Sequence, residues 1–196
     1  MIVGIVGKQG RGKTLLLSIL AYYTSRLGSF NVRYLLTKEI FSLANVKKVY
    51  ANYKLSFPFE PVLTPDDLEK MTGGSAFLDE FYQWAKARKS MSGINAQINN
   101  IAMAARKRDV DVFWTSHRFG KLDKDIRAIT DVILAPEYNL FTGAMDVTIL
   151  DAIEKQARIL GKFSIYAKPF YSVYDTKEEI ADAHSHKGNN TQEPED

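Results

Sequence analysis

A glycine-rich segment near the amino terminus has the residue types and spacing that phosphate binding requires. Residues 7–14 read GKQGRGKT and fit the pattern G-x-x-x-x-G-K-[ST] at every fixed position. Glycines let main-chain N–H groups turn inward around a phosphate, and a helix that follows points its positive end at the same place. We expect Lys13 to reach the terminal phosphates of a nucleotide and the Thr14 hydroxyl to bind a bridging Mg²⁺ ion. The residues expected to contact ATP and Mg²⁺ are Gly7, Gln9, Gly10, Arg11, Gly12, Lys13 and Thr14.

Two carboxylates, Asp79 and Glu80, end the apolar segment 75–80. Open α/β sheets bind their ligands at the carboxyl ends of such strands. We expect Asp79 to hold Mg²⁺ through its water shell and Glu80 to polarise the attacking water as a general base. The alternative, two solvated carboxylates at a strand end, is the weaker interpretation after a matched phosphate loop. Glu80 favours hydrolysis, because kinases that act on small molecules often lack this second carboxylate.

A histidine and two basic clusters complete the set of candidate residues. His117 follows the apolar segment 111–116, where a side chain can sense the γ-phosphate if this strand neighbours the first one; a structural role is the alternative. In the cluster 106–108, one arginine is a candidate to reach a neighbouring subunit's γ-phosphate, although cations at a helix end are favourable regardless of function. A candidate contact to a phosphate backbone is formed by Lys86, Arg88 and Lys89.

Strands that alternate with helices must position these residues. The apolar and β-branched segments predict strands over 2–6, 47–56, 75–80, 111–116 and 131–136. Apolar spacing and capping residues predict helices over 14–27, 64–71 and 94–107, with a short one after 116. This order predicts an α/β fold, a mainly parallel sheet with helices on both faces, which with the phosphate loop is the three-layer P-loop NTPase fold. Segment 138–175 is expected to add extended strands or a hairpin at one sheet edge.

Some details of these elements can be tested individually. In the first helix, Leu16, Leu20 and Tyr23 lie on one apolar stripe, and Gly28 is placed to end the helix. Thr64 is expected to cap the short helix that follows it. The glycine-rich segment lies between a strand and a helix, the context that gives its motif meaning; a strand-to-helix turn that binds nothing is the alternative.

Composition sets the outer limits of the interpretation. The 196 residues suit one domain, which we place at 1–180, and the polar segment 181–196 is expected to be a disordered tail. The net charge is only +3, so a nucleic-acid partner must be met by local patches. The absence of cysteine excludes disulfides and thiolate metal sites. No apolar run approaches the roughly 18 residues of a membrane helix, and no secretory signal is visible, so we expect a soluble intracellular domain.

The order of these parts resembles the FtsK/HerA-type DNA-pumping ATPases, most of all the genome-packaging ATPases of membrane-containing icosahedral viruses. It is also similar to the zonula-occludens-toxin-like proteins of filamentous phages. The resemblance covers roughly residues 1 to 176 and rests on GKQGRGKT, VYANYKL, AFLDE, RKRDVDVFWTSHR, LDKDIRAITDVIL and YSVYDT. The family pattern usually has glutamine where this chain has His117, and mapping its trans-acting arginine points to Arg106 first and Arg108 second.

The resemblance implies a homo-oligomeric ring on DNA that binds ATP between subunits. Its packaging branch threads double-stranded viral DNA into a capsid, which implies capsid or vertex proteins as partners and a place in the host cytoplasm or on the virion. The absence of a membrane segment favours this branch. Three alternatives remain open: a zonula-occludens-toxin-like ATPase that exports single-stranded DNA, a small-molecule kinase or switch that never touches DNA, and a scaffold that does not hydrolyse nucleotide.

Overall fold

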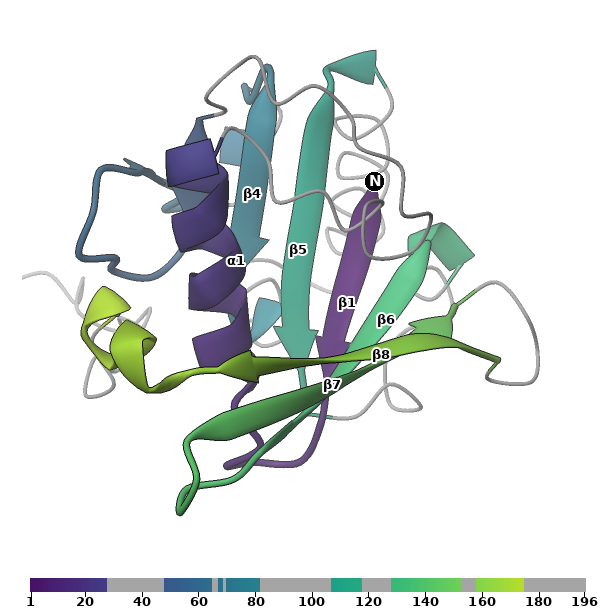
Figure 1. Cartoon of the computed structure of the whole chain (residues 1–196). Helices are drawn as coiled ribbons and strands as arrows, with labels where there is room; N and C mark the ends of the chain where they lie inside the picture. The colour runs from purple at the N-terminus through teal and green to yellow at the C-terminus, as the bar shows by residue number, and fades with distance from the viewer. Residues whose placement is uncertain are drawn as a thin grey trace, which may run out of the picture.

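The structure is a computed structural model that describes residues 1–27, 48–64, 67–68, 70–81, 107–117, 128–152 and 158–174. These residues form one sheet in the strand order β3-β2-β4-β5-β1-β6-β7-β8, with helix α1 packed on it (Figure 1). The elements are β1 (Ile2–Val6), α1 (Lys13–Leu27), β2 (Val49–Ala51), β3 (Glu60–Pro61), β4 (Gly74–Leu78), β5 (Val110–Ser116), β6 (Val132–Tyr138), β7 (Ala144–Asp151), β8 (Ile159–Tyr166) and the 3₁₀-helix η3 (Lys168–Val173). None of the helices in the described ranges is long and apolar enough to cross a membrane.

The six strands from β3 to β6 are parallel to one another, as the alternation of strands and helices predicts. Strand β1 lies between β5 and β6, so that Ile5 pairs with Thr115 on one side and Leu134 on the other. His117 can lie beside the phosphate loop only if the strand before it neighbours the first strand, and β5 does pair with β1. Because the strands are parallel, the residues that follow β1, β4 and β5 gather at one edge of the sheet.

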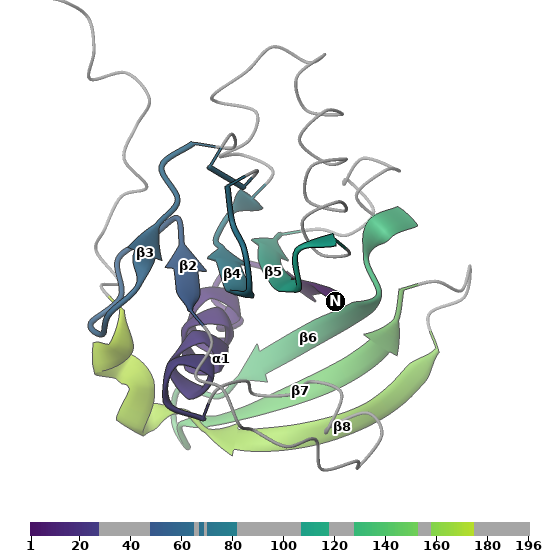
Figure 2. The same ribbon diagram turned by 90° about the horizontal axis from the view of Figure 1, so that it is seen from above.

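Strands β7 and β8 are antiparallel additions at the far edge, which confirms the expectation for segment 138–175. Figure 2 shows that these strands curve toward α1, so the sheet wraps partly around the helix. The core on this face includes residues of α1, β7 and η3 together. The resulting fold is α/β, with a mostly parallel sheet and antiparallel C-terminal strands. The expected helix 94–107, most of the one after 116 and the tail 181–196 lie outside the described residues.

Helix α1 confirms the predicted helix, which begins one residue earlier than expected, but it is not buried along a single stripe. The consecutive residues Leu15, Leu16 and Leu17 are all buried and belong to one apolar cluster. The reason lies in segments distant in sequence: η3 packs on the side of α1 that the parallel strands leave open. There the ring of Phe170 lies 5.7 Å from that of Tyr22, centroid to centroid. The predicted end at residue 28 lies outside the described residues.

Strand β2 is shorter than the segment 47–56 predicted for it. Directly after β2, the Asn52 side chain forms hydrogen bonds with the main chain of Asp79, the residue that follows the neighbouring strand β4. The Asp79 amide donates to Asn52 Oδ1 at 2.7 Å, and Asn52 Nδ2 donates to the Asp79 carbonyl at 2.9 Å. The expected helix 64–71 is described only in part. In that part the Thr64 amide and hydroxyl both donate hydrogen bonds to the Asp67 carboxylate. Thr64 is therefore a donor at the start of this helix, and Asp67 is the acceptor.

Candidate nucleotide-binding site

The loop between β1 and α1 has the backbone shape of a phosphate cradle. Gly10 and Gly12 have φ values of 77° and 83°, a left-handed conformation that glycine adopts without a steric penalty. The Arg11 amide donates to the Lys8 carbonyl at 3.3 Å, and the Leu16 amide donates to the Gly12 carbonyl at 2.8 Å. The turn therefore leads directly into the first turn of α1, whose free amides point toward the loop. This arrangement can hold a phosphate group.

Gly12 is also confined by its neighbours across the loop. A Cβ atom built there would lie 2.9 Å from the Tyr138 Cβ and 2.8 Å from the Met145 Cε. Real Cβ atoms essentially never approach so closely, so a side chain at this position would displace the end of β6. The motif's second fixed glycine is thus required by conformation and by packing together.

Lys13 is buried and connects the loop to the end of β5. Its Nζ donates to the Lys8 carbonyl at 3.4 Å and lies 3.2 Å from Nδ1 of His117. An ammonium group has only donors, so Nδ1 must accept and the imidazole proton sits on Nε2. Nε2 in turn lies 3.0 Å from Oε1 of Glu80. Lys13, His117 and Glu80 therefore form one hydrogen-bonded chain from the loop to the second carboxylate.

The Asp79 carboxylate lies beside Thr14, the second residue of α1. Thr14 Oγ1 donates to that carboxylate, at 3.0 Å from Oδ2 and 3.2 Å from Oδ1. The hydroxyl of Thr115, a residue of β5, donates to Oδ1 from the opposite side. Asp79 is only 8% exposed, so these hydroxyls replace the water that a carboxylate normally needs. The carboxylate is thereby fixed in position.

The oxygen atoms of Thr14 and Asp79 suit Mg²⁺, a hard cation that prefers oxygen ligands. Among the described residues no group of three or more His, Cys, Asp or Glu side chains could hold a metal. Mg²⁺ usually takes most of its ligands from phosphates and water, so it needs few protein oxygens. The residues present therefore fit a phosphate-bridging magnesium ion.

Glu80 has a backbone conformation that separates it from Asp79. Its φ is 44°, a region that costs a non-glycine residue about 1–3 kcal/mol and is common at functional sites. The Glu80 amide donates to Thr115 Oγ1 at 2.8 Å, which helps to hold this conformation. Burial raises the pKa of Glu80, while His117 opposes the rise and Asp79 adds to it. A raised pKa brings the carboxylate closer to the pKa that suits a base at neutral pH.

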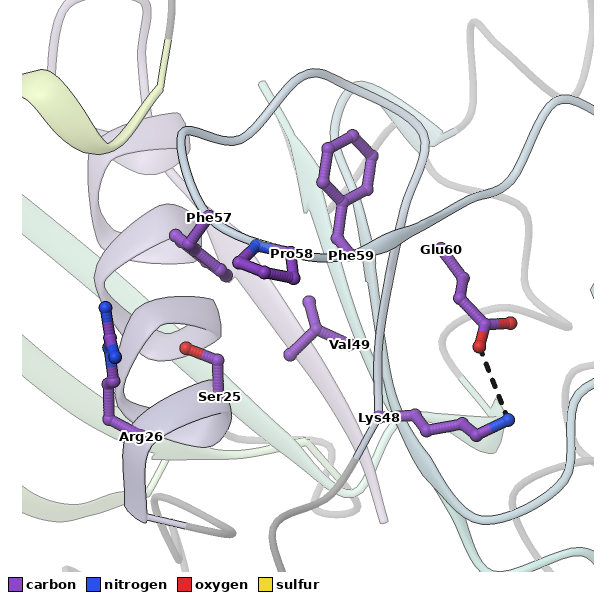
Figure 3. Close-up of a pocket in the computed structure, with 8 residues that line it drawn as sticks. All are labelled: Ser25, Arg26, Lys48, Val49, Phe57, Pro58, Phe59 and Glu60. Carbon is purple, nitrogen blue, oxygen red and sulfur yellow. Dashed lines mark ion pairs between the residues drawn. The ribbon is translucent and has the colours of Figure 1, made fainter.

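The loop and the Glu80 carboxylate face one pocket of about 660 Å³, within the range of about 300–1,000 Å³ typical of small-molecule sites. It is lined by Gln9, Gly10, Gly12, Lys13, Thr14, Leu15, Glu80, His117, Tyr138, Leu140, Tyr171 and Tyr174. A smaller pocket of about 390 Å³ lies at the carboxyl-terminal end of α1, where Lys48 and Glu60 form an ion pair of 3.3 Å (Figure 3). This second pocket contains none of the residues predicted for the site.

Two predicted arginines lie apart from the larger pocket. The Arg11 guanidinium lies 3.8 Å from Glu137 Oε1, and Arg11 does not line the pocket. Arg108 precedes β5, whereas His117 follows it, and a seven-residue strand separates the two by about 23 Å. Arg108 is therefore remote from the loop of its own chain. The positions of Arg106 and of the cluster Lys86, Arg88 and Lys89 lie outside the described residues.

Three contributors to the site have no role in the sequence-based prediction. Asn52 and Thr115 hold the main chain and the carboxylate of Asp79. The wall formed by Tyr138, Leu140, Tyr171 and Tyr174 faces the loop from the C-terminal strands. Asn52 does have a signal in the sequence, because it is a polar residue directly after a buried strand, as Asp79 is. The wall has none, since its residues meet the loop only through the sheet extension.

Several solved structures are similar to this chain. The N-terminal domain of zonular occludens toxin from Neisseria meningitidis aligns with a TM-score of 0.54 and 18% identity, over 89% of this chain and 98% of that one. The DNA-packaging ATPase B204 of Sulfolobus turreted icosahedral virus aligns at 0.47 and 14% identity, over 81% and 95%. The flagellar accessory protein FlaH of Methanocaldococcus jannaschii aligns at 0.48 and 12% identity, over 84% and 88%.

No protein-family model and no curated protein matches the sequence. At these identities the likeness concerns the fold alone. The fold shared with the N-terminal domain of zonular occludens toxin is a mostly parallel α/β sheet with antiparallel C-terminal strands, as the sequence predicts.

Proposed function

We propose that this chain is a Mg²⁺-dependent ATPase that works as a ring on DNA and packages double-stranded viral DNA into a capsid. The observation that carries the ATPase part is the convergence of three strand ends on one pocket. After β1 comes Lys13, after β4 come the two carboxylates, and after β5 comes His117. Hydrogen bonds already join Lys13 to His117 and Thr14 to Asp79. Phosphate binding, metal binding and water activation thus have residues within reach of one another.

Each of these residues has a chemical task in the proposal. The loop amides and Lys13 bind the β- and γ-phosphates. Thr14 and Asp79 hold Mg²⁺, which neutralises charge that develops on the phosphates. Glu80 accepts a proton from the attacking water as that water approaches the γ-phosphorus. When ATP enters, Lys13 turns toward the phosphates and leaves Nδ1 of His117, so that loss of the γ-phosphate after hydrolysis can be reported along β5.

The assignment of a motor is supported by the position of Arg108. Because this residue lies about 23 Å from His117 along β5, it cannot reach the loop of its own chain, and a role on the γ-phosphate is open to it only at the site of a neighbouring subunit. An arginine supplied in trans, Arg106 or Arg108, ties hydrolysis to contacts between subunits. In the proposal these contacts move DNA through its backbone, which carries little sequence information. Capsid or vertex proteins are the proposed docking partners, in the host cytoplasm or on the virion.

Phosphate release measured with and without DNA tests this proposal. We expect turnover that requires Mg²⁺ and rises with double-stranded DNA, with a stimulation that weakens as salt increases. Lys13→Ala should abolish nucleotide binding, whereas Glu80→Gln should still bind ATP and lose about 10²- to 10⁴-fold in turnover. Stimulation by single-stranded DNA alone would favour the zonula-occludens-toxin-like alternative. Turnover indifferent to both polymers, with phosphate appearing on a small molecule, would refute the motor in favour of a kinase.

A further inference from the structure

The pocket has two chemically different halves, and the triphosphate accounts for only one of them. The loop side presents amides, Lys13 and Glu80, which suit phosphates and water. The opposite side presents Tyr138, Leu140 and Tyr171, which carry no positive charge and are largely apolar. A flat and largely apolar wall is the surface on which a nucleobase stacks. The pocket is therefore complementary to a ligand that is charged at one end and aromatic at the other.

The wall is held rigidly against the loop. Tyr138 is the last residue of β6 and lies against Gly12, and its ring meets that of Tyr171 edge to face, with centroids 6.2 Å apart. The turn between β6 and β7 is closed by Asn139, whose Oδ1 accepts hydrogen bonds from the amides of residues 141 and 142. The start of η3 is fixed by the Ala167 amide, which donates to the Gly143 carbonyl at 2.8 Å. In Figure 1 this turn lies at the same end of the sheet as the loop after β1.

The wall retains surface that a ligand can cover. Tyr171 is 44% exposed and Leu140 is 77% exposed, although both line the pocket. A rigid, preformed apolar surface binds a flat ring without the entropic cost of ordering a loop. Leu140 has a useful neighbour, because Phe141 lies on the same turn, is 95% exposed and does not line the pocket.

We propose that this wall is the nucleobase subsite: a purine base stacks against Tyr171 and is bordered by Leu140, while the triphosphate lies in the loop. The inference rests on the proposed function, since it presumes that the loop binds the phosphates. Recognition here is through the face of the base, so a purine, which has the larger face, is preferred over a pyrimidine. The substrate class is thus a purine nucleoside triphosphate.

Calorimetric binding of two probes to the full chain tests the subsite: a nonhydrolysable ATP analogue and inorganic tripolyphosphate, each with Mg²⁺. Tyr171→Ala should weaken the ATP analogue on the order of 10- to 100-fold and leave tripolyphosphate unchanged. Tyr171→Phe keeps the ring and should bind the analogue like the unmodified chain. Leu140→Ala should weaken the analogue, whereas the matched variant Phe141→Ala should not. A CTP analogue should bind more weakly than the ATP analogue.

The outcomes separate the subsite from the proposed function. If Tyr171→Ala binds the ATP analogue as tightly as the unmodified chain, the subsite is wrong while the phosphate loop stands. If the substitution weakens tripolyphosphate equally, Tyr171 supports the loop and does not contact the base, which also overturns the inference. If the unmodified chain binds neither probe, the proposed function itself fails.

Discussion

His117 Nε2 lies 3.0 Å from Glu80 Oε1, while the other ring nitrogen of His117 lies 3.2 Å from the ammonium of Lys13. One imidazole thus links the residue expected to bind phosphate to the residue expected to activate water. The family pattern that this sequence resembles usually has glutamine here. A glutamine can also accept from lysine and donate to a carboxylate, so both side chains can link these two residues.

The pH dependence of ATP turnover is the first consequence. Glu80 acts as a base only when it is deprotonated, and burial raises its pKa above the ordinary glutamate value of about 4.3. We expect kcat/KM to fall as the pH drops through this raised value. In His117→Ala the fall in kcat/KM should occur at still higher pH, because the variant removes the contact by which His117 lowers the pKa of Glu80. If kcat/KM falls at the same pH in both proteins, His117 does not lower the pKa of Glu80.

Substitution of Gly12 by alanine should be more damaging than the same change at Gly10. Both positions have positive φ, so each alanine costs about 1–2 kcal/mol in conformational strain. Only at Gly12 does the added Cβ also overlap Tyr138 and Met145, whereas at Gly10 it meets nothing within 4 Å. Thermal unfolding and binding of an ATP analogue, measured on both variants, check the difference. Equal losses would show that packing against β6 adds nothing.

Asn52→Ala should destabilise the fold and weaken the response to Mg²⁺. The substitution leaves the main-chain amide and carbonyl of Asp79 without their partners, at a cost of about 1–3 kcal/mol in the free energy of unfolding. Asp79 then loses its fixed orientation toward Thr14. Urea unfolding and a Mg²⁺ titration of ATP turnover measure the two effects. In the control Asn139→Ala the freed amides are exposed to water, so the loss of stability should be smaller.

Tyr138→Phe should be nearly neutral. The Tyr138 hydroxyl is buried and has no hydrogen-bond partner within the described ranges. Removing an unpartnered buried polar group leaves stability unchanged or raises it, so we expect a change within about 0.5 kcal/mol. Chemical unfolding and binding of the ATP analogue are the measurements. A clear loss in either would mean that the hydroxyl serves a group that the described residues do not include.

Prediction from sequence succeeded where the signal is local. The loop motif, the buried strands and the carboxylates after β4 each occupy a few consecutive residues whose periodicity and composition carry the information. It failed where distant segments decide the outcome. The burial of α1 on more than one side depends on η3, and the early end of β2 depends on the pairing of Asn52 with Asp79. Neither relationship leaves a trace in the spacing of residues near α1 or β2.

The wall of the pocket illustrates the same limit. In the sequence, Tyr138 precedes β7 and Tyr171 follows β8. The antiparallel pairing of β6 with β7 and of β7 with β8 brings the chain back to the loop between β1 and α1. The sequence predicts extra strands at this edge, but not the direction in which they curve. That direction determines which side chains face the loop between β1 and α1.

The wrapping of the sheet around α1 has a consequence for how the protein is made. Tyr22 emerges from the ribosome long before Phe170, so the apolar surface of the helix that η3 covers remains open until residues 168–173 have been made. Contacts between such distant segments slow folding, because a very long stretch of chain must close before they form. A nascent chain that stalls before η3 therefore displays an uncovered helix, which is a natural target for chaperones.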